Sequence, residues 1–333
     1  MLAAAPFDSE ARNLLLAVAA LALDWLIGDP RWLWRGRLHH PIVLLGGLIA
    51  LLERRLNRPA VSNRARRWRG AASVLIAVGC AALIGWLIAL AAAELRFGWI
   101  AELVLLVVLI AQRDLFDHVR HVGAALKRDG LEGGRAAVAR IVGRDPESLD
   151  RHGVLRAAIE SLAENFSDAV IAPLFWYLLL GPIGICGYKA VNTLDSMIGH
   201  RSDRFLAFGM VAARVDDAAN LIPARLSGVL LAIAAAFVPA ARPFAALAAM
   251  WRDAAKHRSP NAGWPEAAMA GALDLALAGP RRYHGTFVAD PWIGAGRARA
   301  ELPDLRRALA LFVLACVIAA ALIVVALILL LEA

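Results

Sequence analysis

The sequence has little cysteine and few charged residues, and both shortages exclude whole classes of protein. It contains three cysteines, Cys80, Cys186 and Cys316, and none belongs to a CxxC pair. That spacing excludes a disulfide framework and a thiolate metal site. Charged residues make up 19% of the chain, below the quarter that is usual in soluble proteins. Neither a GxxxxGKS/T loop nor a dinucleotide-binding glycine fingerprint is present, so other groups must hold any nucleotide.

Apolar side chains are abundant instead. They make up 60% of the 333 residues, whereas soluble domains contain about 45–50%. No strand-like alternation of useful length and no internal repeat is present. The composition therefore predicts an all-α fold, that of a polytopic integral membrane protein with a cytoplasmic helical active-site region between its transmembrane helices. We expect a single domain over residues 1–333.

The apolar runs predict where the chain crosses the membrane. Spans are expected near 11–27, 71–93, 99–112 and 308–331, and 226–250 is ambiguous because Pro239 and Pro243 interrupt it. The run 42–52 is too short to span and predicts an interfacial or re-entrant helix. Seven arginines within residues 53–69 place that loop in the cytoplasm. By the same topology, the polar segments 113–225 and 251–304 are cytoplasmic.

The net charge of +8 is concentrated in arginine. In a membrane protein such a balance indicates cytoplasmic loops and anionic lipid. No nucleic-acid motif accompanies the charge, so we predict membrane lipid as a partner and no nucleic acid.

A first polar cluster consists of Glu160, Glu164 and Asp168. Their i, i+4, i+8 spacing places them within about 80° of one helix face. Three carboxylates in a row repel one another, and a hard cation such as Mg²⁺ relieves that repulsion. A metal or substrate site is one interpretation, and a solvated acidic face is the other.

A second cluster follows the apolar run. Lys189 and Asn192 share one helix face and Asp195 lies beside it. Lys189 can neutralise phosphate charge, while Asn192 and Asp195 can ligate a metal or position an amine. Packing and capping of a polar helix is the alternative.

The third cluster contains Arg214, Asp216, Asp217, Asn220 and Arg225. Its DDxxN arrangement resembles the acidic helices that hold Mg²⁺–phosphate in several membrane transferases, and the two arginines can donate bidentate bonds to phosphate. An Arg–Asp network at the lipid interface is the alternative. Two further stretches offer walls for one site: GDPRWLWRGRLHHP at 28–41, with His40, and HRSPNAGWPEAAMAG at 257–271, with Asn261 and Glu266.

These stretches together resemble one family. ESLAENFSDAVIAPLFW, YKAVNTLDSMIGHR, FGMVAARVDDAANLIPARL and PNAGWPEAAMAGAL are similar to motifs of the CobD/CbiB family of cobalamin biosynthesis, and GDP at 28–30 and HHP at 39–41 look like its N-terminal motif. The resemblance runs from about residue 20 to about residue 300. It implies adenosylcobinamide-phosphate synthase, a ligase of the bacterial inner membrane with its active site facing the cytoplasm. Such enzymes use ATP to join adenosylcobyric acid to (R)-1-amino-2-propanol phosphate or a related amino alcohol.

Residue roles follow as hypotheses from this chemistry. ATP is expected as a substrate and Mg²⁺ as the cofactor, because activating a carboxylate concentrates negative charge. Either Asp195 or Glu266 takes the proton of the amine. The expected Mg²⁺–ATP ligands are Glu160, Glu164, Asp168, Asp216 and Asp217. The expected phosphate and substrate contacts are His40, Lys189, Asn192, Arg214, Asn220, Arg225 and Asn261. Partners are the corrinoid, the amino-alcohol phosphate and other late membrane enzymes of the pathway.

Three other functions stay open at this point. A membrane phosphotransferase acting on a lipid-linked alcohol would explain the DDxxN helix. A non-enzymatic membrane sensor of the AmpE type would not need every cluster. A transporter is disfavoured, because the polar clusters are predicted on one side of the membrane. The exact amino alcohol and the choice between acyl-phosphate and adenylate routes are not encoded in any motif.

Overall fold

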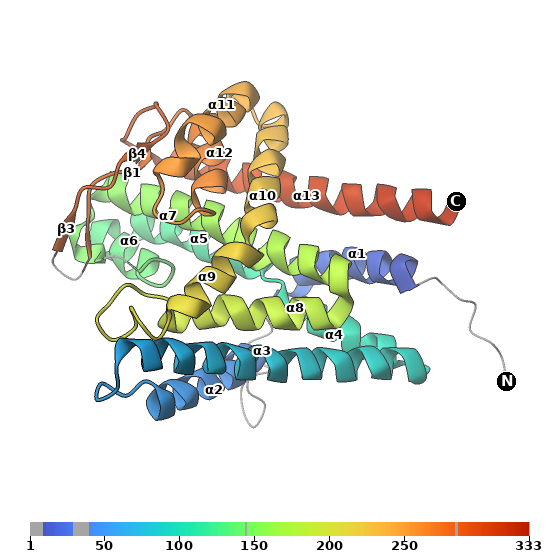
Figure 1. The fold of residues 1–333 in the computed structure, drawn as a ribbon. Coiled ribbons are helices and arrows are strands. Elements are labelled where there is room, and N and C mark those ends of the chain that lie inside the picture. The colour runs from blue at the N-terminus through green and yellow to red at the C-terminus, as the bar shows by residue number, and fades with distance from the viewer. Residues whose placement is uncertain (1–8, 29–39, 144, 284–285, 333) are drawn as a thin grey trace. The chain divides into compact units, whose positions relative to one another are not determined.

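The computed structural model describes residues 9–28, 40–143, 145–283 and 286–332, and most of them are helical (Figure 1). The chain forms two compact units, each assembled from separate stretches. Unit 1 contains Met1–Ala111, Ala172–Asn220 and Ile323–Ala333, and unit 2 contains Gln112–Ile171 and Leu221–Leu322. The three predicted polar clusters are therefore divided between the units, and each unit is described by itself.

Within the described residues, unit 1 is built from six helices and the last turns of a seventh. They are α1 (Ser9–Ile27), α2 (Pro41–Leu56), α3 (Asn63–Glu94), α4 (Gly98–Leu109), α8 (Ala172–Ile198), α9 (Met210–Ala219) and the end of α13 (Leu302–Glu332). A core cluster joins α2, α3, α8 and α9, and it includes the fully buried Ile49, Ala77, Leu194 and Phe208. Burying a side chain as large as those of Ile49, Leu194 and Phe208 stabilises the folded state by about 1.5–3 kcal/mol.

Local signals explain where these helices begin. The ring of His40 accepts the backbone N–H of Ile42 (Nδ1–N distance 3.2 Å), and Pro41 occupies the first turn of α2, where a missing N–H costs nothing. Ser62 caps α3 by accepting the N–H of Ala65 at 3.3 Å. The predicted short apolar run 42–52 thus forms a 16-residue helix that carries two arginines in its last turn.

The chain reverses direction inside α8. Gly181 has φ 62° and ψ −150°, a conformation open essentially to glycine alone, and Pro182 follows it. Three residues later, a Cβ on Gly184 would overlap the carbonyl oxygen of Trp176. In a straight helix, residues eight apart are separated by about 12 Å. Residues 172–180 and 182–198 are therefore two helical arms that fold back on each other, as Figure 1 shows.

Unit 2 surrounds α7 with the remaining elements. Its α-helices are α5 (Gln112–Arg128), α6 (Gly130–Val138), α7 (Arg151–Phe166), α10 (Leu221–Ala234), α11 (Pro243–Asp253), α12 (Gly263–Leu273) and most of α13. Its shorter helical segments are η1 (Pro146–Ser148), η2 (Ser167–Ile171), η3 (Ala235–Phe237) and η4 (Ala254–Lys256). Asp150 caps α7 through the N–H of Gly153, and the rings of Phe166 and Phe312 meet edge to face in the core with centroids 5.6 Å apart.

The predicted all-α class needs one correction. Unit 2 contains two short antiparallel pairs, β1 (Leu277–Ala278) with β4 (Trp292–Ile293) and β2 (Arg281–Tyr283) with β3 (Thr286–Val288). Strands of two or three residues carry no alternation that a sequence pattern can reveal. The fold is therefore mostly helical with a small β element.

Three helical stretches of the described residues are long and apolar enough to cross a membrane by length and composition: Asn63–Glu94, Arg151–Ile198 and Leu302–Glu332. The first and third contain the predicted spans 71–93 and 308–331. The second was not predicted as a span, and it lies inside the segment 113–225 that was predicted to be cytoplasmic. The predicted spans 11–27 and 99–112 correspond to α1 and to the 12-residue α4, and neither passes as a span.

The ambiguous segment 226–250 is broken in the structure. Helix α10 continues into η3, the chain then turns, and α11 begins at Pro243. The pair Met210–Ala219 and Leu221–Phe237, bent by 47°, would add a fourth candidate span if it crosses as one element.

Candidate functional site

The first candidate site lies within unit 1, where the second arm of α8 meets α9. We call it the α8–α9 cluster, and it consists of Tyr188, Lys189, Asn192, Asp195, Asp216 and Asn220. Several members are buried: Asn220 is 1% exposed, and Lys189 and Asp216 are each 8% exposed. Polar groups at this depth must be paired or must serve a ligand, because burying them alone costs several kcal/mol.

A directed chain of hydrogen bonds orients Asp216. The hydroxyl of Tyr188 donates to Oδ1 of Asn220 at 2.9 Å, so the amide nitrogen of Asn220 is turned the other way. That nitrogen donates to Oδ2 of Asp216 at 3.0 Å. The second carboxylate oxygen, Oδ1, is buried without a hydrogen-bond partner. The cluster therefore fixes one carboxylate and leaves one of its oxygens available to a cation or a donor.

Two α8 side chains act on the same carboxylate. Asn192 hydrogen-bonds to the carboxylate of Asp216, whereas the charge of Asp195 repels it. The Asp195 carboxylate lies against Gly199, where a Cβ would overlap its Oδ1, so this position admits no side chain. The structure thus brings together residues of the second and third predicted clusters, which the sequence separates by more than twenty positions.

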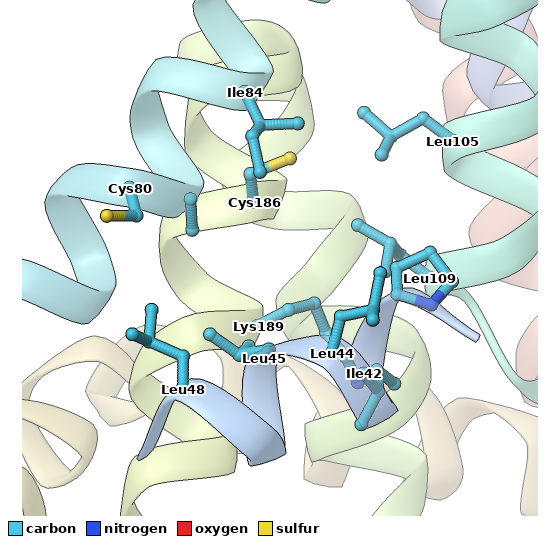
Figure 2. Close-up of a pocket in the computed structure, with 12 residues that line it drawn as sticks. Ile42, Leu44, Leu45, Leu48, Cys80, Ile84, Leu105, Leu109, Cys186 and Lys189 are labelled. Atoms are coloured by element: carbon cyan, nitrogen blue, oxygen red, sulfur yellow. The ribbon is translucent and has the colours of Figure 1, made fainter. Parts of the chain in front are cut away.

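Lys189 also lines an apolar cavity of about 290 Å³ in unit 1. Helices α2, α3, α4 and α8 supply its walls, and Figure 2 shows Lys189 beside Leu44 and Leu45 of α2. Lys189 carries the one charged side chain among the lining residues. Lys189 therefore lines this cavity from the same arm of α8 that carries Asn192 and Asp195.

The second candidate site lies within unit 2, and we call it the 257–266 cluster. It consists of Arg225, His257, Asn261, Trp264 and Glu266. The Arg225 guanidinium lies 4.5 Å from the centroid of the Trp264 ring and donates to Oδ1 of Asn261 at 3.2 Å. Glu266 is 3% exposed, and its Oε1 lies 3.6 Å from Nε2 of His257. Arg225 therefore contacts Trp264, which lies two positions before Glu266 in the first turns of α12.

Asp253 anchors the loop that carries this cluster. Its buried carboxylate accepts bonds from Arg252 (2.5 Å), Lys256 (2.7 Å) and the backbone N–H of Gly294 (2.9 Å). The Arg252 guanidinium in particular holds the pKa of Asp253 well below its usual range, with Lys256 adding to the effect. Asp253 therefore stays ionised at neutral pH and ties the end of α11 to the residue that follows strand β4.

The three members of the first predicted cluster differ in burial and in local helix type. Glu160 is buried, and its Oε1 accepts the N–H of Ala278 at 2.9 Å, which ties α7 to β1. Glu164 is exposed, whereas Asp168 is half-buried and lies in the π-helical segment η2. A π turn changes the angular step per residue, so the 100° rule that placed Asp168 above Glu164 does not hold there. Within the described residues, no group of three His, Cys, Asp or Glu side chains is placed to hold a metal ion.

The remaining predicted residues are placed as follows. Arg214 is exposed on α9, and Asp217 is half-buried and interacts electrostatically with Arg201. His40 caps α2. The rest of the predicted wall at 28–41, from residue 29 to residue 39, lies outside the described residues. Sequence reasoning missed Tyr188, His257 and Trp264, although each lies inside a quoted motif; a hydroxyl or imidazole within an apolar or proline-flanked run was the available signal.

The fold and the two clusters define a helix-rich protein with apolar helices long enough to cross a membrane and with polar sites inside each unit. Comparison with known proteins narrows this class. The family model described as "CobD/Cbib protein" matches residues 17–312. The chain belongs to the CobD/CbiB family.

Curated relatives match almost end to end. The "Cobalamin biosynthesis protein CobD" of Sinorhizobium sp is 51% identical over 311 residues, covering 92% of this chain and 96% of the relative. The protein of the same name from Rhizobium meliloti (strain 1021) is 48% identical over 310 residues, covering 92% and 94%. That from Rhodobacter capsulatus is 47% identical over 300 residues, covering 89% and 92%. No solved structure matches the chain.

Proposed function

We propose that this protein acts in cobalamin biosynthesis as adenosylcobinamide-phosphate synthase, an ATP-dependent ligase. It would join a carboxylate of adenosylcobyric acid to the amine of (R)-1-amino-2-propanol phosphate or a related amino alcohol. Membership of the CobD/CbiB family supports the pathway. The observation that carries the chemistry is the oriented, buried carboxylate of Asp216, with one oxygen available and Lys189 on the neighbouring helix.

The donor set of the α8–α9 cluster fits Mg²⁺. Mg²⁺ prefers oxygen ligands and usually takes one or two carboxylates from the protein, completing its shell with water and substrate phosphate. Asp216 and Asp195 would supply the protein oxygens, with Asp217 on the same helix. When bound, Mg²⁺ would neutralise phosphate charge. Lys189 and Asn192 would orient the phosphates, and Arg225 and Asn261 would serve the second phosphate-bearing substrate. Glu160, Glu164 and Asp168 stay predictions as further ligands.

The reaction balances in two steps. The substrate carboxylate first displaces ADP or pyrophosphate from ATP and becomes an acyl phosphate or acyl adenylate. The amine then forms the C–N bond, the C–O bond to the phosphoryl group breaks, and that group leaves with the electron pair. The nitrogen loses a proton, for which Asp195 and Glu266 are the proposed acceptors. The arginines of 53–69 favour an inner-membrane protein whose clusters face the cytoplasm.

A direct assay tests this function. Purified protein in detergent receives adenosylcobyric acid, the amino-alcohol phosphate and Mg–ATP, and the amide is sought by mass spectrometry. ADP or AMP in the same samples distinguishes the two routes. Recovery of intact acid from protein that unfolds cooperatively on heating would refute the proposal. An Asp216→Asn variant that keeps the full rate and an unchanged Mg²⁺ requirement would remove Asp216 from the mechanism.

A further inference from the structure

His257 lies beside the buried carboxylate of Glu266, although no pattern in the sequence singled it out. The residue follows η4 directly, and its side chain is 18% exposed. Nε2 lies 3.6 Å from Oε1 of Glu266, which sits in the first turn of α12. An imidazole held against a buried carboxylate can orient it, stabilise its charge or relay its proton.

The backbone decides which ring nitrogen carries the proton. Nδ1 of His257 lies 3.0 Å from the backbone nitrogen of Ser259 and 3.3 Å from its carbonyl oxygen, and the shorter contact is the one in which the N–H donates to Nδ1. A neutral imidazole has one donor and one acceptor nitrogen. We assign the proton of His257 to Nε2, the nitrogen that faces Glu266, because this tautomer satisfies the shorter of the two contacts at Nδ1.

Packing holds the ring in this position. The hydroxyl oxygen of Ser259 accepts the N–H groups of Asn261 at 3.2 Å and Ala262 at 3.3 Å, which closes the loop. A Cβ on Gly263 would overlap the carbonyl oxygen of Ala254 and lie 2.8 Å from Cβ of His257. The start of α12 therefore packs directly against the backbone of Ala254 and the Cβ of His257, which fixes the position from which the imidazole extends.

We propose that His257 is a positioning residue for Glu266 and that Glu266, rather than Asp195, accepts the proton of the attacking amine. This inference rests on the proposed function. The Nε2–H of His257 stabilises the ionised carboxylate and aims its second oxygen at the amine. As the C–N bond forms and the phosphoryl group leaves, the proton moves from the nitrogen to Glu266. Arg225, packed on Trp264 in the same cluster, would hold the phosphate of that substrate.

Two substitutions separate the roles of the two ring nitrogens. His257→Gln places an amide N–H near the position of Nε2 but gives up the acceptor for Ser259. His257→Asn places an acceptor near Nδ1 but removes the donor that faces Glu266. We expect His257→Gln to keep kcat within about threefold of wild type and His257→Asn to lower kcat at least about tenfold, since a general base contributes about 10²–10⁴-fold. KM for the amino-alcohol phosphate should change little in either.

A double-substitution cycle tests whether His257 acts through Glu266. In a Glu266→Gln background, His257→Asn should cause no further loss of amide formation, because coupled residues are not additive. His121→Asn is the matched control, since His121 is exposed on α5 in the same unit. All variants are measured as full-length protein in detergent, with thermal unfolding recorded alongside.

The outcomes are distinct. An active wild type with His257→Asn at the wild-type kcat overturns the inference and leaves the function standing. Equal losses in both variants, accompanied by lower thermal stability, also overturn it, because they assign His257 a structural role. Additive losses in the Glu266→Gln background overturn the link to Glu266. An inactive wild type refutes the proposed function itself.

Discussion

Asn220→Asp tests the electrostatics of the α8–α9 cluster, because it replaces the amide that faces Asp216 by a second carboxylate. The two charged oxygens would lie about as far apart as the present nitrogen and oxygen, 3.0 Å. At an effective dielectric constant of 20 the repulsion is about 5.5 kcal/mol. Protonating an ordinary aspartate at pH 7 costs about 4 kcal/mol, which sets the upper limit of the loss. We expect a destabilisation of about 2–4 kcal/mol without divalent cation.

Mg²⁺ should reverse this loss. A cation bound between the two carboxylates removes their repulsion, and binding to the folded state alone adds about 2.7 kcal/mol at one hundred times its Kd. The assay is thermal unfolding in detergent with and without Mg²⁺, with KCl at matched ionic strength as the control for screening. Two results would contradict the reasoning: a variant as stable as wild type without Mg²⁺, or a variant whose response to Mg²⁺ equals that of wild type.

Three further perturbations test other contacts. Tyr188→Phe leaves Oδ1 of Asn220 buried without its donor, so we expect a loss of about 1–3 kcal/mol in chemical denaturation, and no loss would argue against the hydrogen-bond chain. Gly70→Ala should destabilise the protein by at least about 1–3 kcal/mol, because the new Cβ overlaps the carbonyl of Phe208. The control is Gly79→Ala on the same helix, whose new Cβ meets nothing within 4 Å, so its stability should stay the same or rise by up to about 1 kcal/mol. Equal melting temperatures for the two variants would refute the close contact at Gly70. Arg204 donates to Glu53 and lowers the pKa of that carboxyl from its usual 4.5, so the stabilisation by this pair is present at neutral pH and is lost as the pH falls below about 4.5. The difference in melting temperature between wild type and Glu53→Gln should therefore disappear at low pH. A difference that does not depend on pH would exclude the ionic contribution.

The polar residues of the candidate sites were accessible to sequence reasoning because burial makes them conspicuous. Asp216, Asn220 and Lys189 stand in apolar surroundings, and a buried polar group in such a chain needs a partner. Periodicity placed Lys189 and Asn192 near one another correctly, since they lie on an uninterrupted arm of α8. Sequence spacing did not reveal that Asp168 lies in a π-helical segment, to which the 100° step of an α-helix does not apply.

Long-range features were less accessible. The Gly181–Pro182 reversal reads in the sequence only as a helix interruption, and its direction depends on a close approach between Gly184 and Trp176. The division of Glu160 and Asp216 between two units depends on contacts between segments far apart in the chain. The pairing of His257 with Glu266 depends on the path of a loop, which proline and glycine suggest but do not specify.

The interleaving of the two units along the chain constrains how the protein can be made. Residues 112–171 leave the ribosome before the rest of their own unit, which begins at Leu221, and unit 1 receives its final segment only from Ile323 onward. Neither unit can be completed as a contiguous block during translation. A nascent chain halted at residue 322 would already contain every member of the α8–α9 cluster, yet the unit around it would be unfinished. Quality-control proteases would therefore meet unit 2 incomplete until Leu322 has been added, and unit 1 incomplete until the last turns of α13 follow.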